Sequence, residues 1–285
     1  METVISLEHR PVARLDPRRV RHAMGRAAWP TSDDLLTAIQ QQLEERLAEI
    51  PMTPLRILEL SRQPGALTKP LQARFPRARI ISTALAAPPK AHTSGWRLPW
   101  KSRPLDIIGD LTRLPFAGQP FDLVIAHMVL HWSPDPLTTL REIRRLLKPG
   151  APVLVTTLGA DTLKELKTTL AEIDQIRHGR SWPRILEFPM LSEFGDLMQH
   201  AGLSQPVVDR DVWCPQFADL FSLLEEMHRM GATNPFRQRS NTLTGKGYFS
   251  AVQHLYRSRY AHGPDSPIPV SLEILYGHAW KKGSP

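Results

Sequence analysis

The sequence has very little cysteine: Cys214 is the only one among 285 residues. A single cysteine excludes an internal disulfide bond and a metal site built from several cysteines. We therefore expect no resident metal and a location in the reducing cytoplasm. Cys214 has no assigned base partner, so we interpret it as a buried strand-end residue and not as a nucleophile.

Long hydrophobic runs are also missing. No stretch approaches the roughly 18 consecutive apolar residues that a transmembrane helix needs. Residues 1–22 lack the uninterrupted apolar core of a signal peptide, and the chain has neither an internal repeat nor a low-complexity tract. These absences predict a soluble protein that is not exported.

Basic residues outnumber acidic ones, 36 to 28, which gives a formal net charge of +8. With 41% hydrophobic residues, the chain can bury the core of one large α/β domain with additions, or of two domains. The positive charge favours an acidic partner such as nucleic acid, a membrane surface or an acidic carrier protein. A basic enzyme without such a partner fits the charge equally well.

One stretch, Leu55–Phe75, predicts a buried strand, a tight turn and a helix in succession. In nucleotide-binding α/β proteins this turn is rich in glycine, because glycine adopts positive φ and lets the backbone approach the ligand. Here Gly65 is the only glycine of the turn. The turn is therefore either a cofactor loop or a plain connection between strand and helix.

Strands and helices alternate along the chain that follows. We predict strands over Ala78–Thr83, Leu105–Ile108, Phe121–Ala126 and Pro152–Leu158, and a helix from Pro136 to Leu147. This alternation predicts a parallel, doubly wound sheet with right-handed crossovers. Later segments predict a helix over Asp161–Ile176, a strand over Val207–Trp213, and a last strand over Ser271–Trp280, antiparallel at the sheet edge.

We divide the chain into an N-terminal helical cover (1–50), a core (51–214, with a helical excursion at 161–190), a helical insertion (215–265) and the last strand (266–285). The cover combines an arginine-rich leader with an amphipathic helix that begins after Ser32. It either packs on the core with solvated arginines, or it also covers the ligand site and meets an acidic partner.

Candidate ligand-binding residues follow the predicted strands, because α/β proteins bind ligands at the carboxyl ends of their strands. The second strand ends at Ala84, without the acidic residue that usually accepts hydrogen bonds from ribose hydroxyls. Asp110 follows the third strand. Its carboxylate either accepts from an exocyclic amine such as that of adenine, or caps the turn at Leu111.

Two histidines follow the fourth strand. His127 and His131 flank its carboxyl end. His131 is either a wall or hydrogen-bonding group near the ligand, or a helix-entry residue beside a Trp132 that packs in the core.

Several segments carry a more specific signal. DLTRLPF at Asp110 and FDLVIAHMVLHW at Phe121, followed by LREIRRLLKPG, are similar to segments of many class I S-adenosylmethionine-dependent methyltransferases. Five further segments resemble the malonyl-acyl-carrier-protein O-methyltransferases of biotin synthesis, the BioC family: Met24–Ala28 (MGRAA), Thr157–Leu166 (TLGADTLKEL), Met230–Asn234 (MGATN), Leu243–Gly245 (LTG) and Glu273–Trp280 (EILYGHAW). A related family of mitochondrial respiratory-complex assembly proteins shares several of them.

The resemblance implies a Rossmann-like seven-stranded mixed sheet with helices on both faces, and S-adenosylmethionine across the carboxyl ends of the first four strands. The implied cofactor-binding positions are Glu59, Ser61, Gln63, Gly65, Ala84, Asp110, Leu111 and His127. The family's first loop is an acidic residue followed by Gly-x-Gly-x-Gly. Glu59 and Gly65 match this pattern, whereas Ser61 and Gln63 replace the first two glycines.

Other departures concern the ribose and the leader. Ala84 stands where the family has its ribose-binding acid, and Thr31 stands near a leader aromatic, whereas the adenine-side Asp110 is retained. Loss of a charged acceptor costs about 1.5–3 kcal/mol, or roughly ten- to a hundredfold in affinity. A side chain at Gln63 adds about 1–2 kcal/mol of strain if that position needs positive φ. Together these changes convert a micromolar site into a millimolar one, unless Arg62 or Gln63 supplies new contacts.

The implied activity is methyl transfer to the free carboxylate of a malonyl group carried by an acyl carrier protein. A carboxylate is ionised at neutral pH, so the reaction needs no general base, and we assign no catalytic residue. A cation must hold the free carboxylate. The candidates are Arg180, Arg237 and Arg239. An acidic carrier protein also matches the positive net charge.

Two other functions stay open. The chain can be a methyltransferase-like protein with a decayed cofactor site that acts as a binding or assembly factor. Nucleic-acid methylation or binding rests only on the charge, because the sequence lacks an Asn/Asp-Pro-Pro-aromatic motif and aromatics interleaved with a basic patch.

Overall fold

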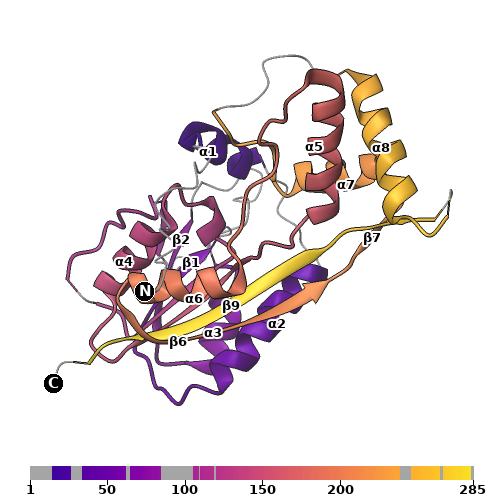
Figure 1. Cartoon of the computed structure of the whole chain (residues 1–285). Coiled ribbons are helices and arrows are strands. Elements are labelled where there is room, and N and C mark those ends of the chain that lie inside the picture. The colour runs from indigo at the N-terminus through magenta and orange to yellow at the C-terminus, as the bar shows by residue number, and fades with distance from the viewer. Residues whose placement is uncertain are drawn as a thin grey trace, which may run out of the picture.

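A seven-stranded mixed sheet forms the centre of the molecule, in the order β3-β2-β1-β4-β5-β9-β6 (Figure 1). The computed structural model describes residues 15–26, 34–61, 65–84, 105–108, 110–118, 120–237, 245–263 and 266–283. The sheet strands are β1 (Arg56–Ser61), β2 (Arg79–Ala84), β3 (Leu105–Ile108), β4 (Leu123–His127), β5 (Pro152–Leu158), β6 (Leu203–Trp213) and β9 (Leu272–Lys281). Strands β1 to β5 are parallel, and β9 is antiparallel to β5 and β6. The predicted α/β methyltransferase-like sheet is confirmed.

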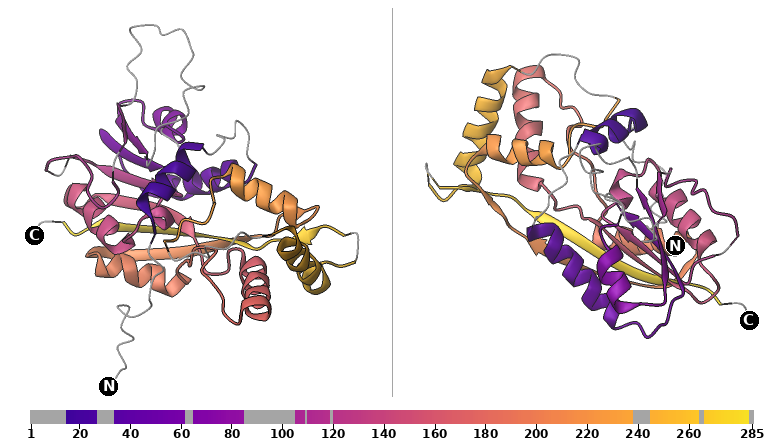
Figure 2. Two further views of the ribbon diagram at one scale, coloured as in Figure 1. Left: turned by 90° about the horizontal axis from the view of Figure 1, so that it is seen from above. Right: turned by 180° about the vertical axis from the view of Figure 1, so that it is seen from behind.

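Helices cover both faces of this sheet (Figures 1 and 2). The described helices are α1 (Pro17–Arg26), α2 (Asp34–Ala48), α3 (Thr68–Arg74), the 3-10 turn η2 (Leu130–Trp132), α4 (Pro136–Leu146), α5 (Lys164–His178), α6 (Leu191–His200), α7 (Leu220–Arg229) and α8 (Lys246–Tyr260). Leu43 of α2 and Leu71 of α3 pack with Ile57 on one face. On the other face, α4 and α6 pack against Leu58. Neighbouring residues of β1 therefore point into different helical layers, as a doubly wound sheet requires.

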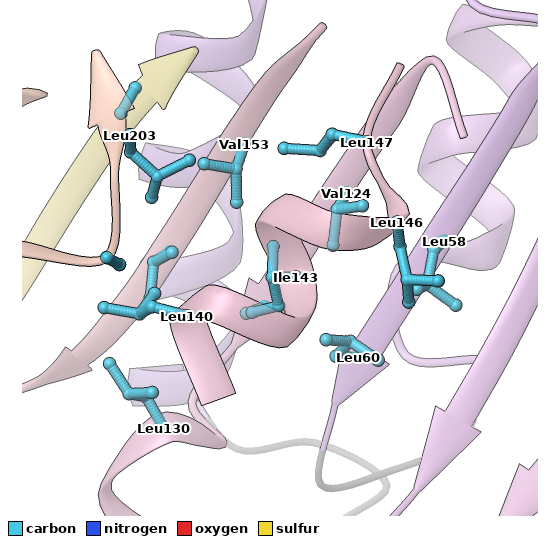
Figure 3. Packing of buried hydrophobic residues seen from close by; sticks show 14 of the residues in the cluster. Leu58, Leu60, Val124, Leu130, Leu140, Ile143, Leu146, Leu147, Val153 and Leu203 are labelled. Carbon is cyan, nitrogen blue, oxygen red and sulfur yellow. The ribbon is translucent and has the colours of Figure 1, made fainter. Parts of the chain in front are cut away.

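Helix α4 shows how the sequence builds one of these layers. Asp135 caps the helix by accepting a hydrogen bond from the Thr138 N–H at 3.0 Å, and Pro136 occupies the first turn. Leu140, Ile143 and Leu146 follow at helical spacing and are fully buried against the sheet (Figure 3). Burial of each such side chain contributes about 1.5–3 kcal/mol.

The predicted position of the last strand is wrong in one respect. Strand β9 is antiparallel, as expected, but it lies between β5 and β6 and not at the sheet edge. Its residues Ile274, Leu275 and Ala279 are fully buried, which suits an interior strand. Strand β6 forms the edge instead, and its side chains alternate between partly buried and exposed positions.

Helices α5, α7 and α8 gather at one end of the molecule, with the two-stranded pair β7 (Gln216–Phe217) and β8 (Ile268–Pro269) (Figures 1 and 2). A buried carboxylate links α5 to α8 and to the loop before α6. The Asp174 carboxylate has no exposed side-chain surface, and it accepts hydrogen bonds from Arg184 Nη2 and Tyr248 Oη, both at 2.7 Å. Burial favours the neutral acid, but these hydrogen bonds outweigh it and hold the pKa of Asp174 below its ordinary value.

Some predicted details differ in the structure. Helix α5 begins at Lys164 and not at Asp161, because residues 159–163 form a turn bonded to β9. Leu55, expected within the first strand, precedes β1 and is 60% exposed. Cys214 follows β6 but is exposed, not buried.

The domain boundaries stay a prediction, and no helix in the described part of the chain is long and apolar enough to cross a membrane.

Candidate functional site

The turn between β1 and α3 is organised around the buried carboxylate of Glu59. Glu59 Oε1 accepts hydrogen bonds from the Leu67 N–H and from Ser61 Oγ, both at 3.0 Å, and Oε2 accepts from Thr68 Oγ1 at 2.9 Å. Burial raises the pKa of Glu59, while these hydrogen bonds oppose the shift. The carboxylate therefore fixes the start of α3.

Gly65 connects this turn to the neighbouring strand. It adopts φ +79°, in the left-handed region that favours glycine, and its N–H donates to Ser82 Oγ of β2 at 2.7 Å. Ala84 is the last residue of β2 and pairs in register with Ile108 of β3. The predicted loop residue Gln63 lies outside the described residues.

Asp110 stands just beyond β3. Its exposed carboxylate accepts hydrogen bonds from the Thr112 N–H at 2.9 Å and from Thr112 Oγ1 at 2.7 Å. Asp110 thus caps this turn, one of its two predicted roles, and contact with adenine stays a prediction. Leu111 is 3% exposed and packs in the core, so its side chain anchors this turn to the sheet.

His127 ends β4 and is buried. Its Nδ1 lies 3.0 Å from Thr156 Oγ1, which also accepts the Met128 N–H at 3.0 Å. Because that hydroxyl has its own proton to donate, we assign Nδ1 of His127 as the acceptor. Burial lowers the pKa of His127 to about 4, so the ring is neutral near pH 7.

The turn η2 continues this edge of the sheet. His131 Nδ1 lies 3.3 Å from Thr157 Oγ1, and its ring meets the Phe188 ring edge to face, with centroids 6.0 Å apart. Trp132 is buried and packs against Val20 of α1. The predicted packing of Trp132 is therefore present, and His131 also contacts a residue from the loop before α6.

Helix α1 is bonded to a distant part of the chain at this edge. The Asp16 N–H donates to the Pro235 carbonyl at 2.9 Å, and Ala232 packs with Val20 and Trp132. Sequence segments that are more than 200 residues apart in number, around 16–23 and 232–235, thus meet above η2. This contact joins two remote parts of the chain beside η2 through residues that no local sequence pattern links.

The predicted carboxylate clamp stays a prediction, because only two of its three arginines lie among the described residues. Arg180 is exposed, and its guanidinium lies 4.8 Å from the centre of the Trp182 ring. It follows the far end of α5, about 20 Å along the helix axis from the turn after β5. Arg237 is exposed beyond Phe236, and Arg239 lies outside the described residues.

The sequence prediction missed Lys167 of α5 and Phe188. Lys167 is half-buried, with Nζ 4.8 Å from the centre of the Phe188 ring. Its position was indicated by the helical pattern, because Lys167 shares a face with the buried Leu163 and Leu170 at spacings of four and three residues. A charged residue within an apolar stripe is a signal for either a structural ion pair or a ligand.

The described residues fit an adenosyl cofactor in part. The chain passes outward from β1 to β3 and then returns to β4 on the other side of β1, so the carboxyl ends of β1 and β4 form the switch point where α/β proteins bind ligands. Asp110 offers an exposed acceptor near this edge, and neutral His127 flanks it. The end of β2 offers no carboxylate to a ribose, because its last residue is Ala84.

Comparisons with known proteins agree with this geometry. A family model described as "Methyltransferase domain" matches residues 58–155. The Malonyl-[acyl-carrier protein] O-methyltransferase of Xylella fastidiosa (strain M23) is 31% identical over 270 residues, which cover 93% of this chain and 88% of that protein. The protein of the same description from Halorhodospira halophila is 31% identical over 272 residues, covering 94% and 89%.

Solved structures support the fold alone. A putative methyltransferase from Bacillus halodurans superimposes with a TM-score of 0.51 at 13% identity, covering 85% of this chain and 98% of that one. The YcgJ protein from Bacillus subtilis gives 0.52 at 14% identity, covering 87% and 98%.

Proposed function

The chain belongs to the malonyl-[acyl-carrier protein] O-methyltransferase family of S-adenosylmethionine-dependent methyltransferases, and on this basis we propose that it methylates the free carboxylate of a malonyl group on an acyl carrier protein, in biotin synthesis. The observation that carries the proposal is the extent of the match, which covers 93% of the chain and continues well outside the general methyltransferase segment of residues 58–155. A cytoplasmic location is part of this proposal.

The segments outside residues 58–155 support the proposed identity of the methyl acceptor. TLGADTLKEL forms the turn after β5 and the start of α5, and EILYGHAW forms most of β9. Glu273 Oε2 accepts the Asp161 N–H at 2.9 Å, and the Glu273 carbonyl accepts Thr162 Oγ1 at 3.0 Å. These two family-like segments therefore hold one another in place near η2, which supports a shared role for them in the proposed acceptor site.

Cofactor binding would use the turn at Gly65, Asp110 for the adenine amine, and the edge at His127. S-adenosylmethionine, when bound, supplies a methyl group on a sulfonium, which is an electrophile. The protein's own residues would orient the acceptor carboxylate and exclude water from the site. No side chain needs to remove a proton, because the carboxylate is ionised at neutral pH.

His127 would contribute a neutral polar group at the carboxyl end of β4, where the proposed cofactor would be held. A protonated imidazole there would repel the positive sulfonium, and burial prevents this by lowering the pKa of His127 to about 4. The Thr156 hydroxyl, 3.0 Å from Nδ1, fixes the ring in one orientation. The residue thus provides a polar wall without a charge.

The net charge of +8 fits an acidic carrier protein as partner. Exposed Arg18 on α1 lies on the helix that packs over Trp132, beside the proposed acceptor side. A carrier docked there would deliver its malonyl group over η2.

The test is methyl transfer from radiolabelled S-adenosylmethionine to malonyl-acyl carrier protein, with acetyl-acyl carrier protein as the control that lacks a free carboxylate. We expect labelled methyl ester only with the malonyl form. Absence of transfer at millimolar S-adenosylmethionine would reject the proposal.

A second candidate function is favoured by one observation, the absence of a ribose-binding acid at Ala84 together with Ser61 in place of a loop glycine. Under it the chain binds a partner without methylating it. Calorimetric titration with S-adenosylhomocysteine separates the two: submillimolar affinity rejects the decayed site, and no binding up to millimolar concentration rejects the enzyme.

A further inference from the structure

Lys167 carries a positive charge that no carboxylate among the described residues binds directly. Its side chain is half-buried, and Nζ lies 4.8 Å from the centre of the Phe188 ring. Burial lowers the pKa of Lys167, although the charges of Glu187 and Asp161 oppose the shift. No hydrogen bond or ion pair joins Nζ to another described residue, so the ammonium has lost part of its hydration, and it gains the Phe188 ring contact and the longer-range attraction of Glu187 and Asp161 in return.

The neighbouring cations differ from Lys167. Lys164, one turn earlier on α5, is exposed and lies 3.6 Å from the Asp161 carboxylate. Arg184 is bonded to Asp174, and Arg177 donates to the Gly247 carbonyl at 2.8 Å. Among these described cations around α5, only Lys167 is both half-buried and without a bonded oxygen.

A chain of contacts connects Lys167 to the carboxyl edge of the sheet. The Phe188 ring under Lys167 meets the His131 ring at 6.0 Å. His131 Nδ1 lies 3.3 Å from Thr157 Oγ1, and the adjacent Thr156 is bonded to His127 at the end of β4. Lys167 is therefore linked through these contacts to the strand ends at which methyl transfer is proposed.

We infer that Lys167 binds the free carboxylate of the methyl acceptor, with Phe188 as the aromatic surface on which the ammonium rests. The inference rests on the proposed function, and it replaces the arginine clamp expected from the sequence. A lysine suits this task better than an arginine, because an ammonium is a point charge that binds one carboxylate oxygen and leaves the other free to attack. A guanidinium binds both oxygens at once.

Three variants separate this role from a structural one. Lys167→Met removes the charge and keeps the unbranched, apolar stem, Lys167→Arg keeps the charge, and Lys164→Met removes an exposed charge from the same helix. The probes are malonyl- and acetyl-acyl carrier protein, titrated calorimetrically into the protein saturated with S-adenosylhomocysteine, and methyl transfer is measured in parallel.

We expect Lys167→Met to weaken malonyl-carrier binding by about 10- to 100-fold and to leave acetyl-carrier binding unchanged, since only the malonyl form has the carboxylate. Lys164→Met should change neither. Lys167→Arg should retain the preference for the malonyl form while lowering kcat more than it raises KM. Lys167→Met should melt near the wild-type temperature, because Nζ has no hydrogen bond or ion pair to another described residue.

The results also distinguish this inference from the proposed function. If the wild type methylates malonyl carrier and Lys167→Met keeps the wild-type malonyl preference, the inference is wrong and the function stands. If the wild type does not methylate the malonyl carrier, the proposed function is wrong. The role of Lys167 is then tested by comparing how the wild type and Lys167→Met bind malonyl- and succinyl-acyl carrier protein. Loss of a carboxylate preference in Lys167→Met supports the inference, and a wild type without any such preference overturns it.

Discussion

His127 determines a pH response at the scale of one residue. Its folded pKa of about 4 lies below the ordinary value of 6.5 because the ring is buried. The unfolded chain therefore binds a proton there between these two values, while the folded protein does not. The stability that this group contributes is present above pH 6.5 and is lost as the pH falls toward 4.

We predict that His127→Asn, which keeps an acceptor for the Thr156 hydroxyl, reduces the loss of stability at low pH. Between pH 7 and pH 4 the free energy of unfolding should fall less in the variant than in the wild type, by roughly 3 kcal/mol. Denaturant titrations at several pH values measure it. The exposed His262→Asn is the control and should follow the wild type; identical slopes for His127→Asn and the wild type would contradict the prediction.

Ala84 determines how tightly a ribose can be held. A carboxylate at the end of β2 would add a charged acceptor, so we predict that Ala84→Asp raises the affinity for S-adenosylhomocysteine by about 10- to 100-fold. Ala84→Asn, of equal size but uncharged, should gain less. Calorimetry gives both values, and an unchanged affinity in Ala84→Asp would mean that the ribose does not lie at this strand end.

At the scale of elements, the turn between β5 and α5 is attached to β9. The Gly159 N–H donates to the Glu273 carbonyl at 2.8 Å, and the Leu163 N–H donates to the Ser271 carbonyl at 2.7 Å. Arg210 of β6 donates to Glu273 Oε1 at 3.0 Å. One glutamate therefore connects the turn, an interior strand and the edge strand.

Gly159 is necessary for this attachment, because a Cβ at that position would collide with the Glu273 carboxyl group. We predict that Gly159→Ala destabilises the fold by about 1–3 kcal/mol. Gly247→Ala on α8 is the matched control, since a Cβ there meets nothing within 4 Å and alanine favours a helix by up to about 1 kcal/mol. Chemical denaturation measures the free energy of unfolding of both variants. Equal values would show that the turn at Gly159 accommodates a Cβ without destabilising the fold.

Elements that depend on local pattern were predictable from the sequence. The apolar runs of β1, β4 and β5 and the capped helix α4 were predicted within a few residues, because their signals lie within each segment. The interior position of β9 was not, since the partner of a strand is set by residues far away in the chain. The pairing of Lys167 with Phe188 is of the same kind, because Phe188 lies in a loop without its own periodicity.

The whole molecule carries the positive charge that the carrier proposal uses. Surface charges are screened over about 8–10 Å at physiological ionic strength, whereas buried contacts are not. We predict that raising sodium chloride from about 50 to about 300 mM weakens binding of malonyl-acyl carrier protein by about tenfold or more. Binding of S-adenosylhomocysteine should change little, and calorimetry at both salt concentrations checks the pair. Equal salt dependence for the two ligands would argue against an electrostatic carrier surface.

The interior position of β9 has a consequence for how the protein is made. On the ribosome, β1 to β5 emerge before residue 160, whereas the antiparallel neighbour of β5 comes from residues 272–281. Until more than 100 further residues are translated, β5 presents an apolar strand edge without a partner, which is an aggregation hazard. We therefore predict that premature termination upstream of β9 releases a chain that is prone to aggregation.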